Sequence, residues 1–182
     1  MSRRSERLIA QGYYDEEVGG QIVHGLTSKG IQKQTSQTQW GDIGYYTARS
    51  VIRGKSFPLI PGHCWPMEGS TGQVFIQLAQ KIHISHVTLA HITKELSPIG
   101  QIYTAPRKFS TYGLREIGGD EYKLGTYEYS DTGDSFQTFQ IQDHADEMFK
   151  FVRLEIESNY GSNYTCLYNF RVHGRIAGET RG

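Results

Sequence analysis

The stretch FKFVRLEIES, residues 149–158, alternates apolar and charged side chains. Val152, Leu154 and Ile156 take every second position, and Arg153 and Glu155 lie between them. Successive side chains of a strand point to opposite faces, so this period of two predicts a half-buried antiparallel strand. Such a strand needs neighbours in a sheet and a second layer packed on its apolar face.

Further short apolar or alternating stretches precede and follow this one, and no amphipathic helix separates them. The turn-forming segments SPIG, IGGD, SDTGD and NYGSN lie between them. The sequence therefore predicts an all-β fold, an antiparallel β-sandwich of jelly-roll type. The other predicted strands are 73–78, 86–92, 108–114, 124–129, 135–141 and a last one within 163–174.

The first part of the chain has a different character. Ser5 to Gly12 can form two helical turns with Ser5 as the N-cap, so residues 1–18 are expected to contain a short helical segment. Residues 28–39, SKGIQKQTSQTQ, are polar, and Ile31 is their one aliphatic side chain. This composition predicts a mobile loop or an extension that orders on a partner.

Composition excludes several functional classes. The 182 residues carry 19 basic and 19 acidic side chains, and this balance argues against a nucleic-acid partner, which requires a basic excess. No apolar run is long enough to span a bilayer and no signal peptide is visible, although an upstream membrane anchor remains open. Phosphate-binding loops, GxSxG and HExxH are also absent, so we expect no enzyme.

Two possible metal sites and one possible modification site are only weakly indicated by the sequence. His83, His86 and His91 are close in sequence, but residues three apart in a strand face opposite sides, so we do not expect a metal site. Asp131 and Asp134 lack the further oxygen ligands of a calcium loop, and a hairpin turn is the simpler interpretation. Residues 163–165, Asn-Tyr-Thr, form a glycosylation sequon that matters only if the chain is lumenal.

The two cysteines, Cys64 and Cys166, lie too far apart for a metal motif, and from spacing alone they are either buried thiols or a bridge. A bridge would raise the free energy of unfolding by about 4–5 kcal/mol in the chain-entropy model, and it would imply an oxidising compartment. In an extended strand Cys166 shares a face with Tyr164, Tyr168, Phe170 and Val172. Phe170 and Val172 are core residues, whereas buried phenols need hydrogen-bond partners, which suits a binding site.

Four motifs follow one another along the chain and carry a family resemblance: PGHCW at 61–65, TLAHITKELSP at 88–98, TAPRKFSTYGL at 104–114 and NYTCLYNFRVHG at 163–174. Together they resemble the SUN domain of nuclear-envelope bridging proteins, with residues 19–182 as the domain. The resemblance implies a homotrimer, promoted by residues 1–18, which lies in the perinuclear space. Its implied partner is the C-terminal peptide of a KASH protein of the outer nuclear membrane. An upstream segment would anchor the chain in the inner nuclear membrane, and the complex would couple the nucleus to the cytoskeleton without catalysis.

The resemblance also implies individual residue roles. Tyr164 and Tyr168 stand where the family holds the end of the KASH peptide, and His91 and Thr104 match residues of the same site. A free carboxylate only accepts hydrogen bonds, so phenol and imidazole donors suit it. Cys64 and Cys166 match the family's internal disulfide.

Three regions depart from or extend this pattern. The family's monovalent-cation loop corresponds to Val51 to Cys64, and the resemblance makes K⁺ a candidate ligand there, with no cofactor required. This loop is longer than expected and lacks the usual acidic residue, which weakens the case for the cation. Residues 28–46 occupy the place of the KASH lid, a β-hairpin over the peptide, and are unusually polar. The family's third cysteine, before the lid, is missing, which predicts a non-covalent complex.

A function of another class is the alternative. β-Sandwiches commonly carry lectin functions, so a lumenal or extracellular carbohydrate-binding module is the second hypothesis. An exposed Trp65 would serve it as an aromatic platform. A hydrolase ranks third, because no pair of carboxylates can be placed with catalytic spacing.

Overall fold

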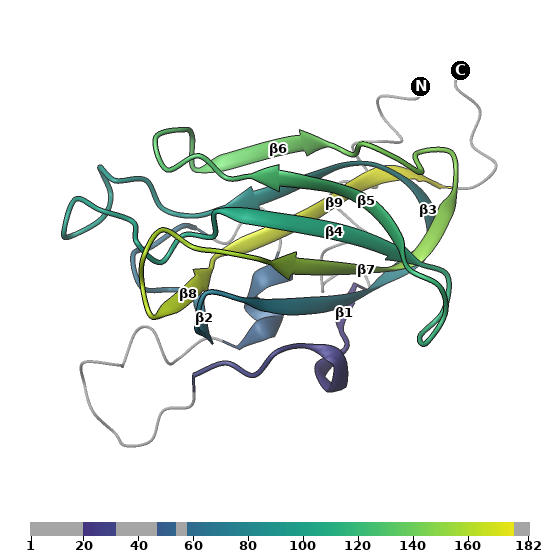
Figure 1. The fold of residues 1–182 in the computed structure, drawn as a ribbon, viewed down its shortest axis with the longest axis horizontal. Helices are drawn as coiled ribbons and strands as arrows, with labels where there is room; N and C mark the ends of the chain where they lie inside the picture. The colour runs from purple at the N-terminus through teal and green to yellow at the C-terminus, as the bar shows by residue number, and fades with distance from the viewer. Residues whose placement is uncertain (1–19, 32–46, 54–57, 177–182) are drawn as a thin grey trace.

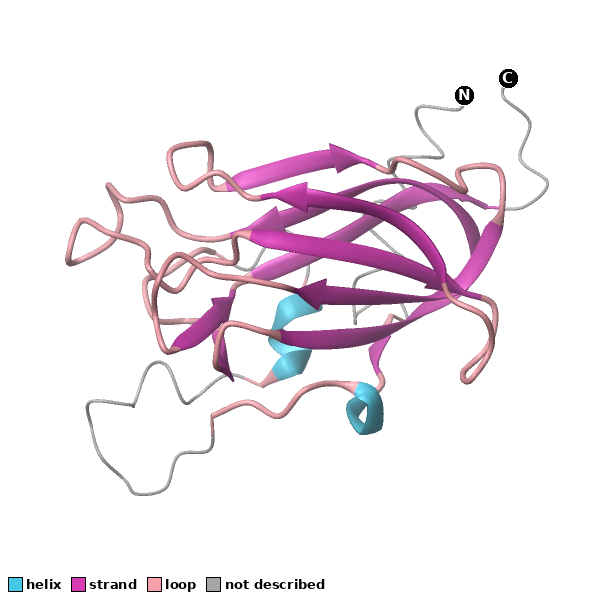
Figure 2. Ribbon diagram, viewed as in Figure 1, coloured by secondary structure: helices cyan, strands magenta, loops and turns pink. Residues whose placement is uncertain are grey.

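The computed structural model describes residues 20–31, 47–53 and 58–176, and strands dominate these ranges (Figure 2). The predicted helical segment in residues 1–18 and most of the predicted lid lie outside the described residues. Two short 3₁₀ helices, η2 (His24–Leu26) and η4 (Ala48–Ile52), accompany the sheets. The strands are β1 (Gln21–Ile22), β2 (Trp65–Glu68), β3 (Gly72–Ala90), β4 (Lys108–Leu114), β5 (Tyr122–Glu128), β6 (Phe136–Gln140), β7 (Met148–Ile156), β8 (Tyr164–Leu167) and β9 (Asn169–Ile176).

All strand pairs between these elements are antiparallel, and the predicted β-sandwich is confirmed. The long strand β3 belongs to both layers (Figure 1). Its first half pairs with β1 on one side and with β7 on the other, and the sheet continues from β7 through β4 to β5. Its second half pairs with β6 and β9. Apolar residues from both halves, such as Ile76 and Leu89, are fully buried in one common core.

The opening stretch behaves as its alternation predicts. In β7 the side chains of Val152, Leu154 and Ile156 are fully buried, whereas Arg153 and Glu155 between them are partly exposed. β7 pairs with β3 on one side and β4 on the other, so it lies inside the sheet and its apolar face packs on the second layer.

Two predictions about strand continuity are wrong. The stretch 73–78 and most of 86–92 belong to one strand, β3, which ends at Ala90, because no Gly, Pro, Asn or Asp interrupts residues 79–85 and Ile82 and Ile84 are buried there. The register of β3 against β7 shifts between Gln77 and Ile82, which lets the strand pass from one layer to the other. Conversely, residues 163–174 form two strands that break at Tyr168, where the chain leaves β2 and joins β3.

Candidate functional site

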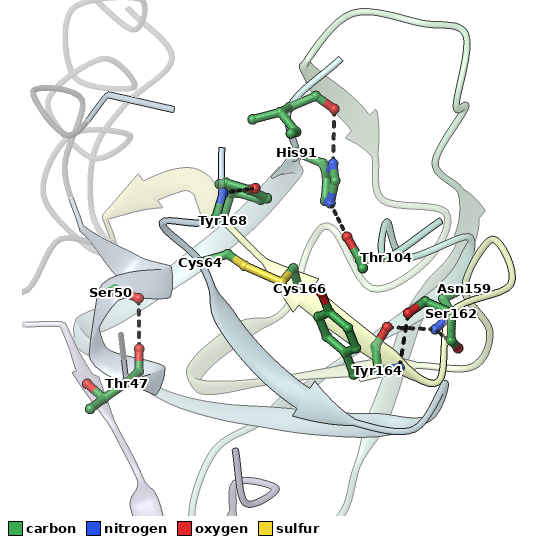
Figure 3. The surroundings of a disulfide bond; sticks show 12 residues. Thr47, Ser50, Cys64, His91, Thr104, Asn159, Ser162, Tyr164, Cys166 and Tyr168 are labelled. Atoms are coloured by element: carbon green, nitrogen blue, oxygen red, sulfur yellow. Dashed lines mark hydrogen bonds between the residues drawn. A yellow bond between two sulfur atoms is a disulfide. The ribbon is translucent and has the colours of Figure 1, made fainter. Parts of the chain in front are cut away.

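A disulfide joins Cys64, just before β2, to Cys166 in β8, with 5.5 Å between the two Cα atoms. Both sulfurs belong to buried residues, and Pro66 of β2 pairs directly with Cys166, so the bridge fastens the two-stranded sheet at one end of the sandwich. The two alternatives left open by spacing are thus resolved in favour of a bridge. Tyr164 and Tyr168 lie on opposite sides of it (Figure 3).

Tyr168 has its hydroxyl held by the backbone. The N–H of Gly62 donates to the Tyr168 oxygen at 3.0 Å, so the phenol accepts this bond and keeps its own proton to donate. Burial raises the pKa of Tyr168 to about 12, and the phenol therefore stays protonated at neutral pH. Tyr164 is half-buried, and burial raises its pKa as well. Both side chains are consequently neutral hydroxyl groups.

His91 lies directly after β3 and is 1% exposed. Its Nδ1 lies 2.9 Å from the carbonyl oxygen of Ile92, which can only accept, so Nδ1 carries the proton. Nε2, 3.1 Å from the Thr104 hydroxyl oxygen, then accepts from Thr104. Burial lowers the pKa of His91 to about 4, which keeps the ring neutral. The ring also meets Tyr168 edge-on, with 4.7 Å between centroids.

Thr104 belongs to the long connection between β3 and β4. Its backbone carbonyl accepts the N–H of Cys166 at 2.9 Å, which pins this connection against β8. The partly exposed Thr104 side chain therefore stands between buried His91 and strand β8. Three of the four site residues predicted by resemblance, His91, Thr104 and Tyr168, form a connected group, and Tyr164 lies across the disulfide from Tyr168 (Figure 3). We call these four residues the tyrosine site.

The tyrosine site offers hydroxyl groups rather than charges. Buried Tyr168 keeps its proton to donate, because the Gly62 N–H donates to its oxygen. Thr104 donates to neutral His91, so its oxygen remains able to accept. Such a group can hydrogen-bond a small polar or anionic ligand.

Two supporting contacts were not predicted from the sequence. The first is the Gly62 N–H that orients Tyr168. The second is buried Asn169, whose side-chain amide donates to the carbonyl oxygens of Val51 at 3.0 Å and Arg53 at 2.8 Å. An asparagine among apolar strand residues was the available signal, because a buried amide requires partners. Its contacts hold the described start of the candidate cation loop, Val51 to Cys64, and cation binding there stays a prediction.

The weak candidates also have places in the structure. Within the described ranges, no three His, Cys, Asp or Glu side chains are grouped for a metal. Asp131 lies in the turn between β5 and β6 and pairs with Lys94 at 3.4 Å. The predicted turn is present, but the hairpin is wrong, because β5 pairs with β4 and β6 pairs with β3. The expectation of an exposed Trp65 is wrong. Its side chain is 3% exposed in the core, because β2 turns this residue inward, and it is no platform for a sugar.

Only the first four residues of the predicted lid, 28–31, are described. Gly30 forms a β-bridge with Met67, and the N–H of Ile31 donates to the Pro66 carbonyl at 2.8 Å. The chain thus enters the lid region along the edge of β2, the strand that carries the disulfide end of the sandwich. Within the ranges described, neither short helix has the length to cross a bilayer.

Comparison with known proteins shows consistent similarity. The family model "Sad1 / UNC-like C-terminal" matches residues 44–176. SUN domain-containing protein 3 of Bos taurus is 38% identical over 94% of the chain, and SUN domain-containing protein 5 of Homo sapiens is 42% identical over 97%. The nuclear migration and anchoring protein unc-84 of Caenorhabditis elegans is 33% identical over 90%. The chain spans 48% of each of the first two relatives and 15% of the third.

Among solved structures, the family 32 carbohydrate-binding module of Streptococcus pneumoniae EndoD resembles the chain with a TM-score of 0.59. The alignment covers 86% of this chain and 97% of the module at 11% identity. A likeness at this identity establishes the β-sandwich fold and carries no statement about the ligand.

Proposed function

The chain belongs to the Sad1/UNC-like family of SUN domains, and from this premise we propose that its tyrosine site binds the C-terminal peptide of a KASH protein. The observation that supports this most directly is the contact of Tyr168 and Thr104 with His91 beside the Cys64–Cys166 bridge, with Tyr164 on the other side of that bridge (Figure 3). Thr104 comes from the β3–β4 connection and the two tyrosines from β8 and its end, and the fold brings these two segments together.

The chemistry of the site favours a free chain terminus as the ligand. A carboxylate accepts hydrogen bonds only, and Tyr168 retains a proton that it can donate. Bonds to a charged acceptor are shorter and about twice as strong as neutral ones. A terminal carboxylate is absent from any internal peptide, so its recognition would confer specificity for the end of the partner.

The complex is non-covalent in this proposal. The sequence contains two cysteines, and both are consumed by the internal bridge. No thiol is therefore left to form a disulfide with a partner peptide. In this proposal affinity comes from hydrogen bonds and from burial of apolar peptide side chains.

For the whole protein we propose a nuclear-envelope role. An upstream segment would hold it in the inner nuclear membrane, with this domain in the perinuclear space, and homotrimers would bridge to KASH proteins of the outer membrane. The names of relatives that concern nuclear migration and anchoring support this role. The function is mechanical coupling of nucleus to cytoskeleton, in which the domain binds and does not catalyse.

The decisive experiment is a titration with three versions of one KASH tail peptide: the free acid, the C-terminal amide, and the free acid extended by one residue. We expect the amide and the extended peptide to bind at least about ten-fold more weakly, since hydrogen bonds to a charged group contribute about 1.5–3 kcal/mol. Isothermal calorimetry measures all three affinities. Equal binding of the three peptides would exclude capture of the terminus.

A further inference from the structure

The loop between β7 and β8 ends at Asn163, and Asn163 together with Tyr164 and Thr165 of β8 fits the N-glycosylation acceptor pattern Asn-X-Ser/Thr. The other asparagines of the chain, Asn159 and Asn169, are not followed by this pattern. The acceptor is therefore unique in the sequence, and it adjoins the tyrosine site directly, since its middle residue is Tyr164.

The loop has a defined shape that turns Asn163 outward. Asn159 organises it, with its side-chain amide within 3.2 Å of the Ser162 and Tyr164 carbonyls (Figure 3). The same amide lies 3.0 Å from the Thr165 hydroxyl. The Asn163 carbonyl accepts the N–H of Gly69 at 3.0 Å, which anchors its backbone to the turn after β2. The Asn163 residue itself is exposed. A bulky hydrophilic group on its side-chain nitrogen therefore projects to solvent without disturbing the core.

We propose that Asn163 carries an N-linked glycan. This inference rests on the lumenal location in the proposed function, because N-glycans are attached in the secretory lumen, which is continuous with the perinuclear space. Sequence pattern, exposure and a surface loop are the three requirements for a retained glycan, and all three are met at this residue.

The structure also determines when the glycan is attached. Thr165 is fully buried, and its hydroxyl donates to the Gly69 carbonyl at 2.9 Å while it accepts from Asn159. The transferase must reach the hydroxyl of the acceptor sequence, and in the folded domain this hydroxyl is enclosed between β2 and β8. Attachment therefore precedes the pairing of Met67 with Thr165, so the glycan is added during synthesis and not to the folded protein.

The first test expresses the full chain behind a secretory signal in cultured cells and treats it with peptide N-glycosidase F. We expect the wild type to migrate more slowly until it is treated. Asn163→Gln should migrate like the treated protein, and Thr165→Ser, which keeps the acceptor pattern, should retain a glycosylated fraction. A wild-type chain whose mobility does not change on treatment would overturn the proposal.

The second test concerns timing and uses unglycosylated chain produced in bacteria. Purified oligosaccharyltransferase with a lipid-linked oligosaccharide should modify the reduced, unfolded chain and leave the folded chain unmodified. Modification of both forms at equal rates would refute the order of events. The proposed peptide function is measured separately, because the bacterial chain lacks the glycan. Loss of peptide binding there contradicts the function, whereas a missing mobility shift contradicts only the glycan.

Discussion

At the scale of single residues, His91 illustrates how burial changes a predicted role. The resemblance assigns it to the peptide site, and the structure places its ring behind Thr104, 1% exposed, with both nitrogens engaged. In the free domain it orients the Thr104 hydroxyl and its ring makes a T-shaped contact with the ring of Tyr168. We therefore regard His91 as a positioning residue for the two hydroxyl groups.

The neutral state of His91 should make stability depend on pH. An unfolded histidine binds a proton near pH 6.5, whereas the pKa of buried His91 is about 4. Between these values the unfolded state binds more protons, so the free energy of unfolding falls as the pH drops from 6.5 towards 4. We expect a loss of about 2–3 kcal/mol by pH 4.5, from about 1.4 kcal/mol per pKa unit.

Urea unfolding at pH 7 and pH 4.5 measures this effect, with His91→Gln as the control. Glutamine can keep one donor and one acceptor but does not titrate in this range. The variant should lose a corresponding part of the pH dependence shown by the wild type. Equal pH dependence in both proteins would mean that other groups cause it.

The two tyrosine hydroxyls can be tested singly. Tyr164→Phe and Tyr168→Phe preserve the rings and remove the donors, so we expect each to weaken binding of a free-acid KASH tail peptide about ten-fold or more. Tyr168→Phe should also lower stability by about 1–3 kcal/mol, because the Gly62 N–H loses its acceptor. Calorimetry and thermal unfolding report the two effects separately. Unchanged affinity in both variants would remove the hydroxyls from the proposed site.

At the scale of elements, the break between β8 and β9 shapes the site. β8 pairs with β2, and β9 pairs with the second half of β3, so the chain changes partners at Tyr168. A single continuous strand would place every second residue on one face. The break instead leaves Cys166, Leu167, Tyr168 and Asn169 all buried, and it directs Tyr168 towards the loop that contains Gly62.

The bridge that fastens this end should contribute strongly to stability. It closes a sequence separation of 102 residues, for which the chain-entropy model gives about 4–5 kcal/mol. We expect Cys64→Ala with Cys166→Ala to lower the free energy of unfolding by a similar amount and to weaken peptide binding, because the loop at Gly62 loses its anchor. Denaturant unfolding measures the first effect. Thiol counting on unreduced, unfolded wild type should detect none, and two reactive thiols would contradict the bridge.

The contact between β9 and β3 gives a test of the sandwich itself. At Gly174 a Cβ atom would overlap the backbone carbonyl of His83 across the strand pair, and backbone cannot move aside as a side chain can. We expect Gly174→Ala to destabilise the domain by about 1–3 kcal/mol, the range for overpacked interiors. Gly25→Ala is the matched control, because no atom lies within 4 Å of its added Cβ. Similar melting temperatures for the two variants would show that the strands are less closely apposed.

At the scale of the whole molecule, assembly remains the principal prediction. We expect the chain to form homotrimers through residues 1–18, although a segment this short supplies little coiled coil by itself. Light scattering across a concentration series should show a mass approaching three times that of one chain. If the chain stays monomeric, fusion to a trimeric coiled coil tests whether assembly strengthens peptide binding. No gain in affinity would mean that each domain binds independently.

The amino-acid sequence by itself determined the class of fold. Period-two alternation, as in residues 149–158, specifies a half-buried strand locally, because neighbouring side chains of a strand always point to opposite faces. Ordered motifs likewise predicted the family and the identity of Cys64, Cys166 and the four site residues. These features depend on residue type and spacing, which can be read from the sequence without a structure.

Tertiary structure alone decided how those residues act. Whether the two cysteines are bridged, whether Trp65 is exposed and whether Thr165 is accessible depend on which distant strands meet. The same holds for His91, whose acceptor role follows from a carbonyl and a hydroxyl placed around it. Burial and hydrogen-bond partners arise from contacts between segments far apart in the chain, and the local sequence pattern does not predict these contacts.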